Sequence, residues 1–255
     1  MVKTTHSNKK MRSARGTTRI KAGKERKIIR LPYVKKIGRR GSISIWQVDG
    51  SFIRTHKDEE FTNYGQHFSF KYIPEDEFWL DQGVSPEEQK FFIKHLSVEY
   101  RLMKNGMDVD SAREKADYVE REERKRAGDV RKLTHSGREL PDPGQVHRRL
   151  WKKLDNGVSV WIVNARLVRS VFDDDFASGG HDHVYEYVPE NEVWIDDTLK
   201  AAERPFSLLH ELHERNLMIK GMDYDRAHAE SSKLERRLRQ HPDDLHEALA
   251  QEGWE

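Results

Sequence analysis

Cysteine is absent from this sequence of 255 residues. The absence excludes disulfide bonds and thiolate zinc sites, and it agrees with a reducing compartment, so we expect a cytoplasmic protein. The sequence contains no run of about 18 apolar residues, the length that a membrane-spanning helix needs. The N-terminal segment lacks the apolar middle region of a secretory signal peptide. Because hydrophobic residues make up only 35% of the chain, we expect modest cores in one large domain or two small ones.

Acidic residues are scarce in the first 40 positions. Residues 1–40 carry 15 Lys or Arg and a single acid, Glu25, a net charge of +14, whereas the remainder has 31 basic and 43 acidic residues, a net charge of −12. Such a segment is typical of a disordered arm.

This basic arm is suited to a polyanion, because each Lys or Arg that binds a phosphate releases a counterion. We therefore predict contact with nucleic acid through Lys9, Lys10, Arg12, Arg15, Arg19, Lys21, Lys24, Arg26 and Lys27. The alternatives are a solubilising tail and an intramolecular partner for the acidic remainder of the chain.

The chain contains an internal duplication with a constant offset of 115 residues and no gap. Matching segments are "SISIWQVDGSFIRT" (42–55) with "GVSVWIVNARLVRS" (157–170), "YIPEDEFWLD" (72–81) with "YVPENEVWID" (187–196), and "LMKNGMDVDSA" (102–112) with "LMIKGMDYDRA" (217–227). Two copies are too few for a solenoid. The sequence therefore predicts a tandem pair of similar domains.

Each copy shows the same pattern of expected elements. Alternating apolar residues around Asp49-Gly50 and around Asn164-Ala165 predict a β-hairpin. A third strand is expected at 67–73 and 183–188, a fourth at 77–81 and 192–196, and two helices follow. The first helix begins after Ser85 or Thr198 and ends at a glycine, and the second begins at a capping aspartate near 108 or 223. The predicted fold is α+β, with an antiparallel sheet and two helices (ββββαα) in each copy.

These patterns divide the chain into five parts. We expect a basic arm at 1–40, a degenerate first copy at 41–127, a linker rich in Pro, Gly and Ser at 128–155, a second copy with a candidate metal site at 156–241, and a tail at 242–255.

One predicted helix in each copy carries a histidine and a glutamate within an apolar stripe. In the second copy Phe206, His210, Glu214 and Leu217 share one helix face, and their equivalents 115 residues earlier do the same. A half-buried carboxylate must be paired, hydrogen-bonded or bound to a cation. A structural His–Glu pair that both copies need in order to fold is the alternative to a metal site.

The second copy adds polar residues that the first copy lacks: Glu211, His213, His228, His181 and His183 stand where the first copy has Leu96, Val98, Arg113, Gln66 and Phe68. Imidazole and carboxylate are good ligands for zinc and related divalent ions. His210 and Glu214 could bind one metal from a single helix face. The third ligand would be His228 on the next helix, or His181 or His183 on a strand edge. Glu211 could then act as general base on a water held by the metal.

The segment "HELHE" (210–214) resembles the His-Glu-x-x-His helix of zincin metallopeptidases, with glutamate at the last position. The resemblance covers Asn191 to His228, and the second copy is also similar to phage and bacterial sequences with the pattern "NE.WID…HELHER". It implies that His210 and Glu214 are zinc ligands, that Glu211 is the catalytic acid/base, and that the reaction is a hydrolysis, of the peptidase type.

Two hypotheses follow. In the first, the second copy is a metal-dependent hydrolase module, and the first copy is its structural partner. In the second, the protein is not an enzyme, and the basic arm attaches two scaffolding modules to nucleic acid or to another protein. Convergence of the second copy's added residues in space would favour the first hypothesis.

Overall fold

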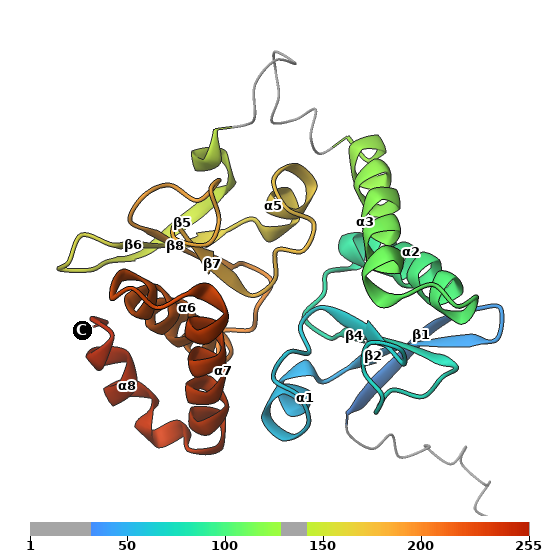
Figure 1. Ribbon diagram of the computed structural model, residues 1–255, viewed down its shortest axis with the longest axis horizontal. Coiled ribbons are helices and arrows are strands. Elements are labelled where there is room, and N and C mark those ends of the chain that lie inside the picture. Colours follow the sequence, from blue (N-terminus) through green and yellow to red (C-terminus); the bar gives the residue numbers. More distant parts are fainter. Residues whose placement is uncertain (1–31, 129–141, 255) are drawn as a thin grey trace, which may run out of the picture.

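The computed structural model describes residues 32–128 and 142–254 and contains two similar halves (Figure 1). The first half contains β1 (Tyr33–Arg40), β2 (Ile43–Val48), α1 (Gly50–His56), β3 (Tyr64–Gln66), β4 (Glu77–Asp81), α2 (Pro86–Lys104) and α3 (Val109–Arg126). The second half contains η1 (Pro143–Val146), β5 (His147–Lys153), β6 (Ser159–Val163), α5 (Ala165–Val171), β7 (Gly179–His181), β8 (Glu192–Asp196), α6 (Arg204–Ile219), α7 (Tyr224–Gln240), η2 (Pro242–Asp244) and α8 (Leu245–Gln251).

The α+β fold and the duplication are confirmed, since the two sheets have the equivalent strand orders β1-β2-β4-β3 and β5-β6-β8-β7. Each sheet is mixed, whereas an antiparallel sheet was predicted. β2 and β4 run parallel, with Trp46 beside Trp79, and β6 and β8 do the same, with Trp161 beside Trp194. The two outer pairings of each sheet are antiparallel.

The predicted hairpin is wrong because its turn is a helix start. The Asp49 side chain accepts a hydrogen bond from the backbone N–H of Phe52 at 3.2 Å, and Asn164 caps α5 in the same way. Asp is a strong N-cap residue as well as a turn residue. The expected second strand of the hairpin is therefore the short helix α1 or α5. The chain passes through this helix and the short strand β3 or β7 before β4 or β8 pairs in parallel with β2 or β6.

Three further expectations differ from the structure. Residues 33–40, placed in the basic arm by charge, form β1, and residues 147–153, placed in the linker, form β5. The third strand is short and lies earlier than predicted, at β3 and β7. The expected tail after residue 241 contains α8.

The two long helices of each half begin and end close to the predicted positions, except that α6 begins at Arg204, several residues later than the start expected after Thr198. Pro86 lies in the first turn of α2, and Gly106 follows its end with φ +91°, a backbone conformation that glycine adopts without strain. The side chains of Asp108 and Asp223 cap α3 and α7. None of the helices in 32–128 and 142–254 is both long and apolar enough to span a bilayer.

Each sheet is covered on both faces, which fixes the position of its helix pair. Phe78 and Leu80 of β4 pack against Phe92 and Leu96 of α2. Trp79, between them in the strand, packs on the opposite face with the side chains around α1. The second half repeats this arrangement with β8, α6 and α5.

The two halves meet through reciprocal buried ion pairs. Arg54 Nη2 of the first half lies 2.8 Å from Glu203 Oε2 of the second. Arg169 Nε of the second half lies 2.6 Å from Glu88 Oε2 of the first. Since the offset of 115 residues relates each pair to the other, the halves pack as the two subunits of a symmetric dimer do, with an approximate twofold relation.

Candidate metal centre

Helices α6 and α7 of the second half bring His210, Glu214 and His228 together. His210 and Glu214 lie one turn apart on α6, and His228 lies in the first turns of α7, which packs against α6. The His228 Nδ1 atom is 2.8 Å from Glu214 Oε2, and the His210 Nε2 atom is 3.4 Å from the same oxygen. The two imidazole nitrogens are 3.2 Å apart. Two histidines and a carboxylate whose ligand atoms all lie within 4.8 Å could hold a metal ion.

Glu235 lies behind His210 and orients its ring. Its Oε2 atom is 3.0 Å from His210 Nδ1, so the imidazole donates from Nδ1 and directs Nε2 at Glu214 and His228. Arg239 holds the other carboxylate oxygen of Glu235 at 2.8 Å. A carboxylate behind a histidine is the usual outer partner of a metal ligand, because it fixes the tautomer and increases the basicity of the ligand.

His181 approaches the other oxygen of Glu214, with Nε2 at 3.0 Å from Oε1. The backbone N–H of His183 donates to His181 Nδ1 at 3.2 Å, so Nδ1 carries the lone pair and Nε2 carries the proton. His181 therefore donates to Glu214 in its neutral form. It also belongs to a second group of neighbouring ligand atoms, together with Glu211 and Glu214.

Glu211 is buried beside this cluster, and a glycine makes room for it. A Cβ atom at Gly179 would lie 2.8 Å from the Glu211 side chain and 2.9 Å from the Trp194 carbonyl oxygen. Glu211 lines the same cavity, of about 120 Å³, as His210, Glu214 and His228. Burial raises the pKa of Glu211 to about 8.

The cluster holds protons when no cation is bound. Burial opposes protonation of His210, but hydrogen bonds to Glu214 and Glu235 raise its pKa well above the usual value. Hydrogen bonds to Glu214 and Glu60 raise the pKa of His228 to about 9. Burial would raise the pKa of Glu214, but the hydrogen bonds from the three imidazoles lower it overall. If such a cluster bound a metal ion it would release protons, since imidazole ligands must be neutral.

The first half lacks this ligand set but has the same frame. His95, Glu99 and Glu120 stand in the places of His210, Glu214 and Glu235. Gln66 replaces His181 and donates to Glu99 at 2.9 Å. Leu96, Arg113 and Tyr64 replace Glu211, His228 and Gly179. Among the residues that the structure describes, the metal-type groups lie only in the second half.

The structure brings together five of the residues singled out in the sequence: His181, His210, Glu211, Glu214 and His228. His183 belongs to neither group, and the His213 ring lies 2.7 Å from Glu252 near α8 instead. The basic residues predicted to contact nucleic acid, Lys9 to Lys27, lie outside the described residues, so that contact stays a prediction.

Two neighbours of the cluster were missed in the sequence. Glu235 follows His228 by seven residues and therefore lies on the same face of α7, a spacing that the sequence shows. Glu60 Oε2, from the first half, lies 3.7 Å from His228 Nε2, and its contact depends on how the halves dock. Comparison with family models, curated proteins and solved structures finds no match to this chain.

Proposed function

We propose that the second half binds one divalent metal ion, of the zinc class, through His210, Glu214 and His228, and uses it for hydrolysis. The observation that carries the proposal is that one ligand atom from each of the three residues lies close to the other two. Glu235 is bonded to the far side of the His210 ring and orients it. Two imidazoles and a carboxylate are a ligand set of catalytic zinc sites, which keep a fourth position open. When bound, a divalent ion polarises a carbonyl or phosphoryl oxygen and activates water near neutral pH.

His181 is a positioning residue in this proposal. Its Nε2–H donates to Glu214 Oε1, and its Nδ1 is already bonded to the His183 amide, so it has no lone pair directed at the metal position. The remaining oxygen of Glu214 faces His210 and His228. One ion and one oriented carboxylate therefore account for both groups of ligand atoms.

Glu211 is the general base. It follows His210 on α6, so its side chain is rotated by roughly 100° from the ligand face and reaches the cavity beside that face. A bound dication lowers the pKa of a neighbouring buried carboxyl group, so Glu211 would be ionised and able to take a proton from water. The resemblance of "HELHE" to the zincin helix supports the same role.

The test is a Glu211→Gln variant, which keeps the shape of the side chain and removes the base. Zinc-reconstituted wild type and variant are compared on casein, p-nitrophenyl acetate and p-nitrophenyl phosphate, with zinc binding measured by calorimetry. We expect hydrolysis by the wild type on at least one substrate, loss with EDTA, and a reduction of about a hundredfold or more in the variant with zinc binding retained. Full turnover in Glu211→Gln, or no metal-dependent hydrolysis in the wild type, would contradict the proposal.

A further inference from the structure

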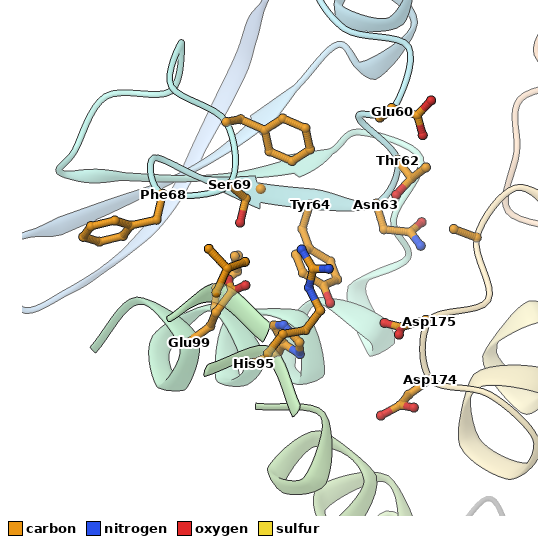
Figure 2. Close-up of a pocket in the computed structure, with 16 residues that line it drawn as sticks. Glu60, Thr62, Asn63, Tyr64, Phe68, Ser69, His95, Glu99, Asp174 and Asp175 are labelled. Carbon is orange, nitrogen blue, oxygen red and sulfur yellow. The ribbon is translucent and has the colours of Figure 1, made fainter. Parts of the chain in front are cut away.

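A second and larger cavity, of about 410 Å³, lies where the first half meets the second (Figure 2). It corresponds by the offset of 115 residues to the cavity of the metal centre, with His95 and Glu99 in place of His210 and Glu214. Thr62 and Ala177 line both cavities, so the two are neighbours. A volume of a few hundred Å³ is typical of small-molecule sites.

The walls of this cavity carry more negative than positive charge. Glu99 comes from α2, and Asp174 and Asp175 come from a loop of the second half that directs both carboxylates toward His95 and Tyr64 (Figure 2). The positive groups on the walls are Arg113 and His95. The His95 ring is already engaged from behind, because its Nδ1 atom lies 3.2 Å from both Asp117 and Glu120.

Asp174 is the unsatisfied member of this set. Its side chain is 7% exposed, and its Oδ2 atom is buried without a hydrogen-bond partner among the described residues. Its Oδ1 atom has a long contact of 3.4 Å with Arg121. A buried carboxylate oxygen without a donor is costly unless a ligand supplies one.

At the equivalent position of the other half, both oxygens of the carboxylate have a hydrogen-bond partner. There the longer side chain of Glu59 stands in place of Asp174, and both of its oxygens receive Arg236 Nη1, at 2.9 and 3.1 Å. Arg236 is the equivalent of Arg121. The shorter Asp174, which lines the cavity, leaves its Oδ2 atom without a partner, so the free oxygen is particular to this half and does not follow from the fold.

Aromatic rings complete the walls. Tyr64, Phe68 and Phe70 line the cavity, and the Tyr64 ring lies 5.1 Å from the His95 ring. Faces of aromatic rings attract cations, and the attraction grows where water is excluded. Carboxylates together with aromatic faces select an organic cation over a hydrated metal ion, which would gain nothing from the rings.

We propose that this cavity binds an organic cation with an amino or guanidinium group that donates to Asp174 Oδ2 and lies against the aromatic wall. The N–H groups of such a ligand satisfy the free oxygen, and its positive charge balances Asp174 and Asp175. Its aliphatic part contacts Tyr64, Phe68 and Phe70. None of the three proposed metal ligands lines this cavity.

The probe is agmatine, which carries both kinds of cationic group, titrated calorimetrically into the full-length, EDTA-treated protein. We expect saturable binding at one site per chain, weakened on the order of ten- to a hundredfold by Asp174→Asn, since a charge-assisted hydrogen bond is lost. Asp175→Asn should weaken it as well. Glu59→Gln, at the equivalent place in the other half, should leave it unchanged, and uncharged 1,4-butanediol should not bind.

Circular dichroism and melting curves verify that each variant is folded. Absence of saturable agmatine binding would overturn the proposal. The same is true of equal affinity in wild type and Asp174→Asn, of an equal loss in Glu59→Gln, or of binding by calcium ions but not by agmatine.

Discussion

At the scale of single residues, Glu214 organises the candidate metal centre because each of its oxygens has a different role. Oε1 accepts from His181, and Oε2 faces His210 and His228. The duplication supplies a natural comparison, since Gln66 donates to Glu99 in the first half from the same place as His181. An amide N–H can therefore replace the imidazole N–H at this position.

This equivalence predicts different results for two substitutions of His181. His181→Ala removes the donor to Glu214 and should lower metal affinity by about 10- to 100-fold, the usual effect of losing an outer partner. His181→Gln retains a donor and should cost less than about tenfold. Zinc affinities measured by competition with a chromophoric chelator show whether His181 positions Glu214 or binds the metal itself. If His181 were itself a ligand, both substitutions would lower the affinity equally.

His95 should make stability depend on pH. Burial opposes its charge, but the hydrogen bond and charge of Glu120 raise its pKa above 6.5 in the folded state. Below pH 6.5 the unfolded histidine is also charged, so the ion pair contributes in full. The contribution falls as pH rises through the folded pKa.

The free energy of unfolding in urea should therefore differ most between wild type and His95→Gln below pH 6.5, and the difference should narrow as pH rises. A difference that stays constant or widens between pH 5.5 and 8.5 would show that the charge of His95 does not stabilise the fold.

At the scale of elements, the long helices α2, α3, α6 and α7 were predictable from the sequence, the short helices α1, α5 and α8 were not, and the sheet was predictable only in part. Pro86, Asp108 and Gly106 are local signals that act within one turn. The dipeptide Asp49-Gly50 is compatible both with a hairpin turn and with the start of a helix. Only the pairing of β2 with β4, which is not local in sequence, decides between them. β1 has the sequence "YVKKIGRR" and is largely exposed, so neither its charge nor its pattern indicates a strand.

The candidate site was also predictable only in part. Residues on one helix could be related by their spacing, and residues at equivalent positions of the two copies could be compared. The spacing on α6 and the contrast with the first copy identified His210, Glu211, Glu214 and His228. Glu60 and Asp174 line cavities to which both halves contribute residues, and no local pattern records how the halves dock.

Helix caps allow a matched test of the role of α7. Asp223 caps α7, which carries His228, and Asp108 caps the equivalent helix α3. Asp223→Ala and Asp108→Ala should each lower the free energy of unfolding measured in urea, because each removes the N-cap of its helix. Only Asp223→Ala should also weaken zinc binding, because the first turns of α7 position a ligand. Equal zinc affinity in the two variants would show that zinc binding does not depend on the start of α7.

At the scale of the whole molecule, a chain of ion pairs connects the interface between the halves to the candidate metal centre. Glu203 binds Arg54 across the interface and Arg239 within its own half. Arg239 binds Glu235, which holds His210. The equivalent network in the first half runs from Glu88 through Arg124 and Glu120 to His95, which is not a ligand in our proposal.

Two substitutions at these equivalent positions should have the same effect on stability and different effects on metal binding. Glu88→Gln and Glu203→Gln each leave buried arginines without their full counter-charge, and each should lower the free energy of unfolding by about 3 kcal/mol. Urea transitions followed by tryptophan fluorescence and circular dichroism should coincide, as for one cooperative unit.

Only Glu203→Gln should also weaken zinc binding, since its network ends at His210. Two separate unfolding transitions in the wild type, or an equal loss of zinc affinity in both variants, would show that the interface does not act as this network requires.

The central claim is that the second half holds a metal centre whose equivalent in the first half has been lost, and metal stoichiometry tests it most directly. EDTA-treated wild type, His210→Ala and His95→Ala are loaded with zinc, passed through a desalting column and measured by elemental analysis. We predict about one zinc per chain in the wild type and in His95→Ala, and none in His210→Ala. No zinc in the wild type, or an equal loss in both variants, would contradict the account.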